Sequence, residues 1–183
     1  MRWPMERVVI LNDKGTGGGL MTPIRCAREL GEFLKAKFDS IDYHPTAEGM
    51  EEKGISVFPG YLPRALSDEA KRKMSPCIVI RVVTVEDTAK EGSTVSLELL
   101  VSTYNKEVVD GYLDLMHILE LCRQWMNQSP IIGKVFALEK PLSVKLPEEQ
   151  GFPTWWGVIE ASYKIPSPGV NVNRLLEDEK NFI

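Results

Sequence analysis

Cysteine is scarce in this sequence. The 183 residues include three cysteines, Cys26, Cys77 and Cys122, which lie far apart and outside any CxxC pair. A disulfide framework uses an even, patterned set, so this spacing favours free thiols in a reducing compartment. A nucleophilic cysteine needs a base beside it, and the chain has two histidines, His44 and His117. We therefore predict three inert thiols.

Positive charge is also in short supply. Lys and Arg number 22 against 26 Asp and Glu, and the net charge of −4 is spread along the chain. Proteins that neutralise phosphates carry a basic surface, so no sequence-specific nucleic-acid partner is predicted. No run approaches the ~20 apolar residues of a membrane-spanning helix, so no membrane partner is predicted. The N-terminus lacks a signal-peptide pattern and is interpreted as mature sequence.

Catalytic and metal-binding motifs are missing as well. There is no GxSxG nucleophile elbow. His117 and Glu120 have a spacing that binds metal when a second such pair faces it, but no second histidine-containing helix is predicted. The carboxylate pairs Glu86–Asp87 and Glu148–Glu149 fall in or beside predicted turns, where acids are usually solvated. The sequence thus predicts no catalytic residue, no metal and no cofactor, and a protein that is not an enzyme.

One glycine-rich segment, LNDKGTGGGL at 11–20, is typical of a phosphate-binding loop in its context. A predicted strand precedes it and a capped helix follows, which is the order such a loop needs. However, Leu20 stands where a dinucleotide fingerprint has its third glycine, and Lys14 precedes the glycines instead of following them. We interpret the segment as a flexible connector. A nucleotide-binding enzyme that uses Gly15–Gly19 is kept as an alternative from another class.

Hydrophobic periodicity predicts an α+β domain. Helical spacing spans 23–38, behind Thr22 as N-cap, and again 110–128. The short β-like run at 55–58 is interrupted by prolines and is predicted to be an edge strand or a loop, and the charged segment 68–73 is interpreted as an exposed linker. Apolar alternation and β-branched residues predict strands at 77–87, 93–105, 134–146 and 156–166. We expect an antiparallel sheet of about four or more strands with two main helices packed on one face.

The helical pattern also assigns side chains to faces. Ile24 opens the predicted buried stripe of the first helix and Tyr112 that of the second, whereas Asp114 and His117 fall on the polar face. Pro141 predicts an edge position or a bulge in its strand.

The organisation of the chain is predicted in three parts. Residues 1–21 form an N-terminal extension with the glycine-rich connector, and 22–168 form a single α+β domain. Residues 169–183 form a C-terminal arm with little core content.

Two adjacent tryptophans, Trp155 and Trp156, follow Phe152 at the start of the last predicted strand. Consecutive strand residues point to opposite faces, so both rings cannot enter the same core. We expect one ring in the core and the other at a rim, a loop or another subunit. Because exposed aromatic side chains are favoured interface anchors, Phe152, Trp155 and Trp156 are a predicted subunit interface. A purely intrachain role stays open, and alanine at either tryptophan is expected to weaken assembly more than folding.

Four segments, taken in order, resemble a family of small proteins of tailed bacteriophages and prophages, the tail terminator (tail completion) or neck proteins. The resemblance covers about residues 20–168. The segments are FPGYLPRALSDE, CIVIRVVTVEDTAKEGSTVSLELLVSTYN, DGYLDLMHILELCRQWMNQSPIIGKVFALEKPLSVKLPEEQ and FPTWWGVIEASYKIP. The chain departs from the family pattern at 11–19 and after Pro168.

This resemblance implies an α+β protomer that assembles into a homo-oligomeric ring at the head-proximal end of the tail tube. Such a ring stops tube growth and offers a surface to the connector. The implied partners are copies of the chain, tail-tube proteins and head–tail connector proteins. The implied location is the virion, with the host bacterial cytoplasm during assembly. A head–tail connector or neck adaptor is the alternative within the same class, and the family has no catalytic residues to transfer.

Overall fold

The structure, a computed structural model, describes residues 22–41, 43–46, 54–61, 67–88 and 92–166. The predicted N-terminal extension (1–21), with its glycine-rich segment, and the predicted C-terminal arm (169–183) lie outside the described residues.

A six-stranded sheet with the order β1-β2-β3-β6-β5-β4 is the centre of the fold. Neighbouring strands are antiparallel except β1 and β2, which run parallel. The predicted α+β fold, with a largely antiparallel sheet, is therefore confirmed. The strands are β1 (Ser56–Pro59), β2 (Cys77–Thr88), β3 (Gly92–Tyr104), β4 (Ile131–Ile132), β5 (Phe136–Lys145) and β6 (Thr154–Ile165).

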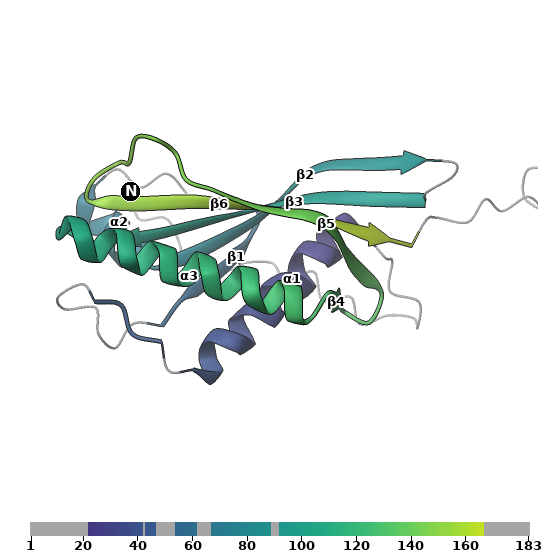
Figure 1. The fold of residues 1–183 in the computed structure, drawn as a ribbon, viewed down its shortest axis with the longest axis horizontal. Coiled ribbons are helices and arrows are strands. Elements are labelled where there is room, and N and C mark those ends of the chain that lie inside the picture. The colour runs from purple at the N-terminus through teal and green to yellow at the C-terminus, as the bar shows by residue number, and fades with distance from the viewer. Residues whose placement is uncertain (1–21, 42, 47–53, 62–66, 89–91, 167–183) are drawn as a thin grey trace, which may run out of the picture.

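Two long helices, α1 (Pro23–Ser40) and α3 (Val108–Gln128), cover the same face of this sheet (Figure 1). Thr22 caps α1 as predicted, because its hydroxyl oxygen accepts the Arg25 amide at 3.2 Å. At Gly31, α1 packs against β1 and β2 with room for a side-chain carbon, since a Cβ built there would be in ordinary contact, 3.5 Å from Val57 and 3.6 Å from Ile80. In the described part of the chain, no helix is long and apolar enough to cross a membrane.

The core lies between the helices and the strands they cover. In β3, every second residue from Ser93 to Val101 is buried and the residues between are half-buried, as the apolar alternation predicts. β6 repeats the pattern, with Ile159, Ala161 and Tyr163 buried beside β3. Pro141 coincides with a shift in the β5–β6 register between Glu139 and Ser143, as predicted for a bulge.

Segment 68–73 is helical, so the predicted linker was wrong. The short helix α2 (Asp68–Met74) replaces it. Its first turn is stabilised by Ser67, whose hydroxyl accepts the Ala70 amide at 3.2 Å, and Glu69 pairs with Lys73 one turn later at 2.7 Å. The charges that suggested an exposed linker thus support an exposed helix.

Three predicted side-chain positions were also wrong. Ile24 is exposed because it lies beside the cap, and the buried stripe of α1 begins at Cys26. Tyr112 is exposed, and the buried position at the start of α3 belongs to Gly111. Asp114, expected on the polar face, is buried.

Candidate subunit interface

Five large apolar side chains are exposed around the start of α3. We call this set the α3-start patch. The exposed fractions are 61% for Val108, 70% for Val109, 48% for Tyr112, 54% for Leu113 and 56% for Phe152. Scattered exposed apolar residues are ordinary, but a group of this kind is a candidate interaction surface.

The α3-start patch is held in place by contacts between the helix and β6. The Asn105 side chain accepts the Glu107 amide at 2.9 Å and so fixes where α3 begins. The Trp155 indole N–H donates to the Asn105 carbonyl oxygen at 2.9 Å, and its ring lies directly under Gly111. Phe152 meets Trp155 edge to face, with ring centroids 6.2 Å apart. Phe152 therefore borders the exposed turn of the helix.

The two tryptophans point to opposite faces of the sheet, as expected. Trp155 belongs to the core and is 8% exposed, whereas Trp156 is half-buried on the face away from the helices. The Gln150 side chain binds the backbone of Trp156. Its oxygen accepts the Trp156 amide at 2.8 Å, and its nitrogen donates to the Trp156 carbonyl oxygen at 3.1 Å. Because Trp155 is packed within its own chain, its alanine variant is now expected to lower folding stability first. The role of Phe152 and Trp156 in a subunit interface stays a prediction.

The sheet face away from the helices carries a row of paired charges. Arg81 pairs with Glu98 across β2 and β3, with 2.8 Å between Nε and Oε2. Lys145 pairs with Glu160 across β5 and β6 at 2.7 Å. These pairs enclose a shallow hollow of about 310 Å³, lined in part by the hydroxyls of Ser96, Ser143 and Ser162. Each carboxylate here already has a cation as its neighbour, so the face is neutral and polar in character.

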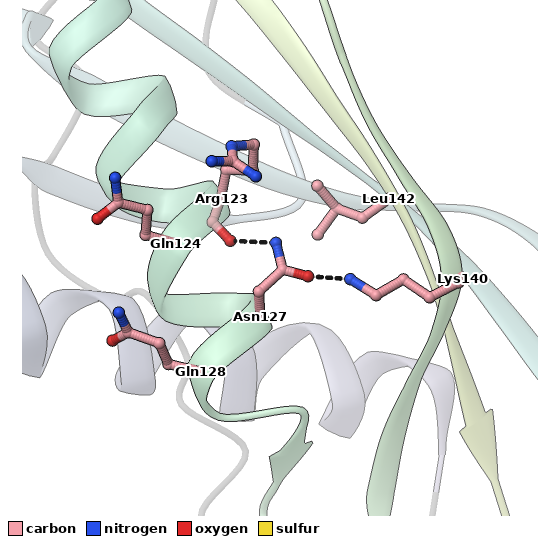
Figure 2. A pocket seen from close by; sticks show the side chains of 6 residues that line it. All are labelled: Arg123, Gln124, Asn127, Gln128, Lys140 and Leu142. Atoms are coloured by element: carbon pink, nitrogen blue, oxygen red, sulfur yellow. Dashed lines mark hydrogen bonds between the residues drawn. The ribbon is translucent and has the colours of Figure 1, made fainter.

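A second hollow, the α3–β5 groove, lies between the last turns of α3 and β5 (Figure 2). It has a volume of about 360 Å³. Lys140 donates to the Asn127 side-chain oxygen, and the Asn127 amide donates to the Arg123 carbonyl oxygen at 2.7 Å. The Arg123 guanidinium also binds Glu120 through two contacts of 2.7 Å. The groove is lined by Arg123, Gln124, Asn127, Gln128, Lys140 and Leu142.

The predicted inert thiols are all buried. Cys26, Cys77 and Cys122 are free and lie within the fold. Burial, with a smaller contribution from Glu29, raises the pKa of Cys26 to about 12, and burial also raises the pKa of Cys122. A thiol becomes a nucleophile only as its thiolate, so these environments work against reactivity.

The acidic and histidine candidates are not brought together. His117 is exposed, and its ring centroid lies 5.9 Å from that of Tyr43. Glu120 accepts hydrogen bonds from Arg123, which lower the pKa of the Glu120 carboxyl to about 2. Glu86–Asp87 lies on the exposed end of β2, and Glu148–Glu149 lies in the exposed loop before β6. Within the described ranges, no three His, Cys, Asp or Glu side chains are grouped to hold a metal ion.

Asp114 is the polar residue that sequence patterning missed. Its carboxylate accepts the Thr46 amide at 3.3 Å, the Thr46 hydroxyl at 2.7 Å and the Asn105 amide at 3.4 Å. It thereby ties the segment after α1 to the start of α3. The hydrogen bonds satisfy a buried carboxylate, which would otherwise be costly.

No protein-family model matches this chain, and no curated protein sequence matches it. The resemblance to tail terminator and neck proteins therefore stays a prediction from the sequence.

Proposed function

We propose that this chain is a structural subunit of a ring at the head–tail junction of a tailed bacteriophage or prophage, in the manner of a tail terminator. In this proposal the chain is not an enzyme. Its partners are copies of itself, the tail tube and the head–tail connector, and it acts in the virion after assembly in the host cytoplasm.

The observation that carries the proposal is the α3-start patch. Its four helical members lie on the solvent side of α3, opposite the side chains that pack into the core. A helix that only covers a sheet needs one apolar face, and among the described residues nothing covers this second apolar surface. Contact with another protein would remove this apolar surface from water, which favours association.

The fold is compatible with the same proposal. The resemblance implies an α+β protomer, and the chain has an α+β fold across the span of the resemblance that the structure describes. Ring subunits use surfaces that are satisfied only by their neighbours, and a protein of this kind needs no cleft for turnover. A head–tail connector or neck adaptor would use such surfaces as well, so the two roles must be separated by phenotype.

Deletion of the gene in the phage or prophage that encodes it tests the function. If the chain terminates tails, electron microscopy of the deletion mutant will show tail tubes of uneven length, and a plasmid copy will restore one length. Tails of normal length that fail to join heads would favour the adaptor role instead. Normal, infectious particles would overturn the proposal.

The nucleotide-binding alternative has its own test. Calorimetry with nucleoside triphosphates is expected to show no binding to the full chain. Tight binding that is lost when Gly17 and Gly19 are replaced by alanine would favour the enzyme and contradict the structural role.

A further inference from the structure

The last six residues of β2 are more exposed to solvent than the rest of the strand. The first four residues of β2 are buried, but all six residues from 83 to 88 are exposed, and we call these six the β2 arm. Figure 1 shows β2 and β3 extending past both long helices. Val83 is 49% exposed and Val85 46% exposed, although both are strand residues. The β2 arm therefore presents apolar side chains that no helix among the described residues covers.

The outer edge of the β2 arm is also open within the described residues. β1 pairs with β2 only from Cys77 to Ile80, so the residues beyond have a strand on one side alone. An open strand edge offers unpaired backbone donors and acceptors to another chain. The exposed acids Glu86 and Asp87 are at this edge, and Asp87 also accepts the Ser93 hydroxyl. The turn that follows lies outside the described residues, and the charges of its Lys90 and Glu91 offset each other.

The opposite side of the sheet carries a complementary surface. β4 pairs only with Phe136 and Ala137, so in the described part of the chain β5 has an open edge from Glu139 to Lys145. The α3–β5 groove runs beside this edge and is lined by two cationic side chains, Arg123 and Lys140. Glu120 offsets one of these charges, which leaves the groove with an excess of positive charge. Leu142 adds apolar lining.

We propose that the β2 arm of one copy docks in the α3–β5 groove of a second copy. Glu86 and Asp87 would then face Lys140 and Arg123, and the exposed valines would meet Leu142. The proposal rests on the self-assembly in the proposed function and names a contact between neighbouring subunits in addition to the α3-start patch. The β2 arm and the β5 edge lie on opposite sides of the sheet, because two strands, β3 and β6, separate β2 from β5.

This placement determines the symmetry of the contact. Because the arm and the groove are different surfaces, the pairing is head to tail and can be repeated from copy to copy. Head-to-tail contacts close into rings when the rotation between subunits allows it. Opposite charges on the two surfaces would also align the subunits before contact.

A charge swap tests the pairing. In sedimentation velocity experiments at low salt, the arm variant Glu86→Lys with Asp87→Lys should self-associate about tenfold or more weakly than wild type, because like charges would meet. The groove variant Arg123→Glu with Lys140→Glu should show the same loss. An equimolar mixture of the two variants should associate again. Association that is unchanged in each variant, or a mixture that stays apart, would overturn the proposed contact.

Disulfide trapping tests the contact even if association is weak. The native cysteines are buried, so introduced surface cysteines will dominate oxidation. A Glu86→Cys chain mixed with a Lys140→Cys chain should form the mixed disulfide in clear excess. The matched control replaces Lys140→Cys with Lys35→Cys, an exposed position on α1. Equal yields in the two mixtures would overturn the arm-to-groove contact.

The two proposals fail in different ways. Equal trapping yields together with overgrown tails in the deletion mutant would remove the arm-to-groove contact and leave the terminator role intact. Selective trapping together with normal tails would keep the contact and remove the phage role.

Discussion

The first two turns of α3 expose different side chains to solvent from those that the later turns of the same helix expose. Toward the sheet, the later turns pack apolar side chains from Leu115 to Met126, whereas the first turns place Gly111 and the buried Asp114 there. Toward solvent, the first turns expose the valines, tyrosine and leucine of the α3-start patch. The later turns expose His117, Arg123 and Gln124, which are polar.

The inner residues of the first turns stabilise the fold, whereas the outer residues are those that the proposed function assigns to a partner. The later turns follow the usual pattern of a helix on a sheet, with one apolar face and one polar face. The first turns instead carry their apolar side chains on the solvent side, with Gly111 and Asp114 on the inner side. The inner side packs against Trp155, and the outer side has no counterpart among the described residues. Substitutions on the two sides should therefore have different consequences.

The largest expected effect is on the inner side. Trp155→Ala should lower the free energy of unfolding by about 3–5 kcal/mol, because it removes a buried indole and leaves a cavity. The lost indole also leaves the Asn105 carbonyl oxygen without its 2.9 Å donor. Urea denaturation measures the change. Phe152→Ala, at the exposed neighbour, should cost less than about 1.5 kcal/mol. Equal losses in the two variants would contradict the division into inner and outer sides.

A smaller effect is expected from adding one methyl group under the helix. In Gly111→Ala, the new Cβ would lie 2.1 Å from the Trp155 indole nitrogen, so the helix or the ring must move. Overpacking of this kind costs about 1–3 kcal/mol. Gly31→Ala in α1 is the matched control, because its new Cβ would meet Val57 at 3.5 Å, which is ordinary contact. That variant should gain about 0.5–1 kcal/mol from helix propensity. If both variants changed the free energy of unfolding in the same direction, Trp155 would not be packed against α3 as described.

The sequence predicts most of the secondary structure because apolar residues repeat with clear periods. The hairpin of β2 and β3, both long helices and the opposite orientations of Trp155 and Trp156 follow from that repetition. Asp114 could not be placed correctly, because its partner Thr46 is 68 residues away in the chain. Helical spacing assigns a face, but it cannot show which distant segment will cover that face.

The α3-start patch was missed for a related reason. The segment VVDGYL has apolar residues on more than one side of the helix, and the pattern alone assigned Tyr112 to the core. The structure puts Gly111 there instead, because only glycine leaves room for the indole of Trp155. A packed aromatic ring from β6 thus decides which side of α3 faces inward.

The buried thiols of α1 and α3, Cys26 and Cys122, lead to a further prediction. Burial raises the pKa of Cys122, and burial raises the pKa of Cys26 to about 12 from 9.0. The unfolded chain loses these protons at lower pH than the folded chain. The stability they contribute is therefore full below pH 9.0 and is lost as pH rises toward about 12.

The pH effect should amount to about 1.4 kcal/mol for each pH unit and each thiol in this range. Urea unfolding on either side of pH 9.0 measures it. Cys26→Ala should reduce the slope of stability against pH, since one of the titrating groups is absent. A wild-type stability that stays constant above this pH would contradict the buried environment of the thiols.

The smallest effect on folding is expected from the outer side of the first turns. Val109→Asp combined with Leu113→Asp should change the free energy of unfolding by less than about 0.5 kcal/mol per site, because both side chains are exposed. The negative charges also suit the first turns of a helix. Ile24→Asp is the matched control: it is an equally exposed apolar residue in the first turn of α1, away from the α3-start patch.

If the α3-start patch is a subunit interface of a tail-terminating ring, these variants should differ in the tails they support. The measurement is the distribution of tail lengths in the deletion mutant when each folded variant is supplied from a plasmid. Wild type and Ile24→Asp should restore a single tail length, whereas Val109→Asp with Leu113→Asp should leave tails uneven. Full restoration of uniform tails by the double variant would contradict the assignment of this patch as a subunit interface.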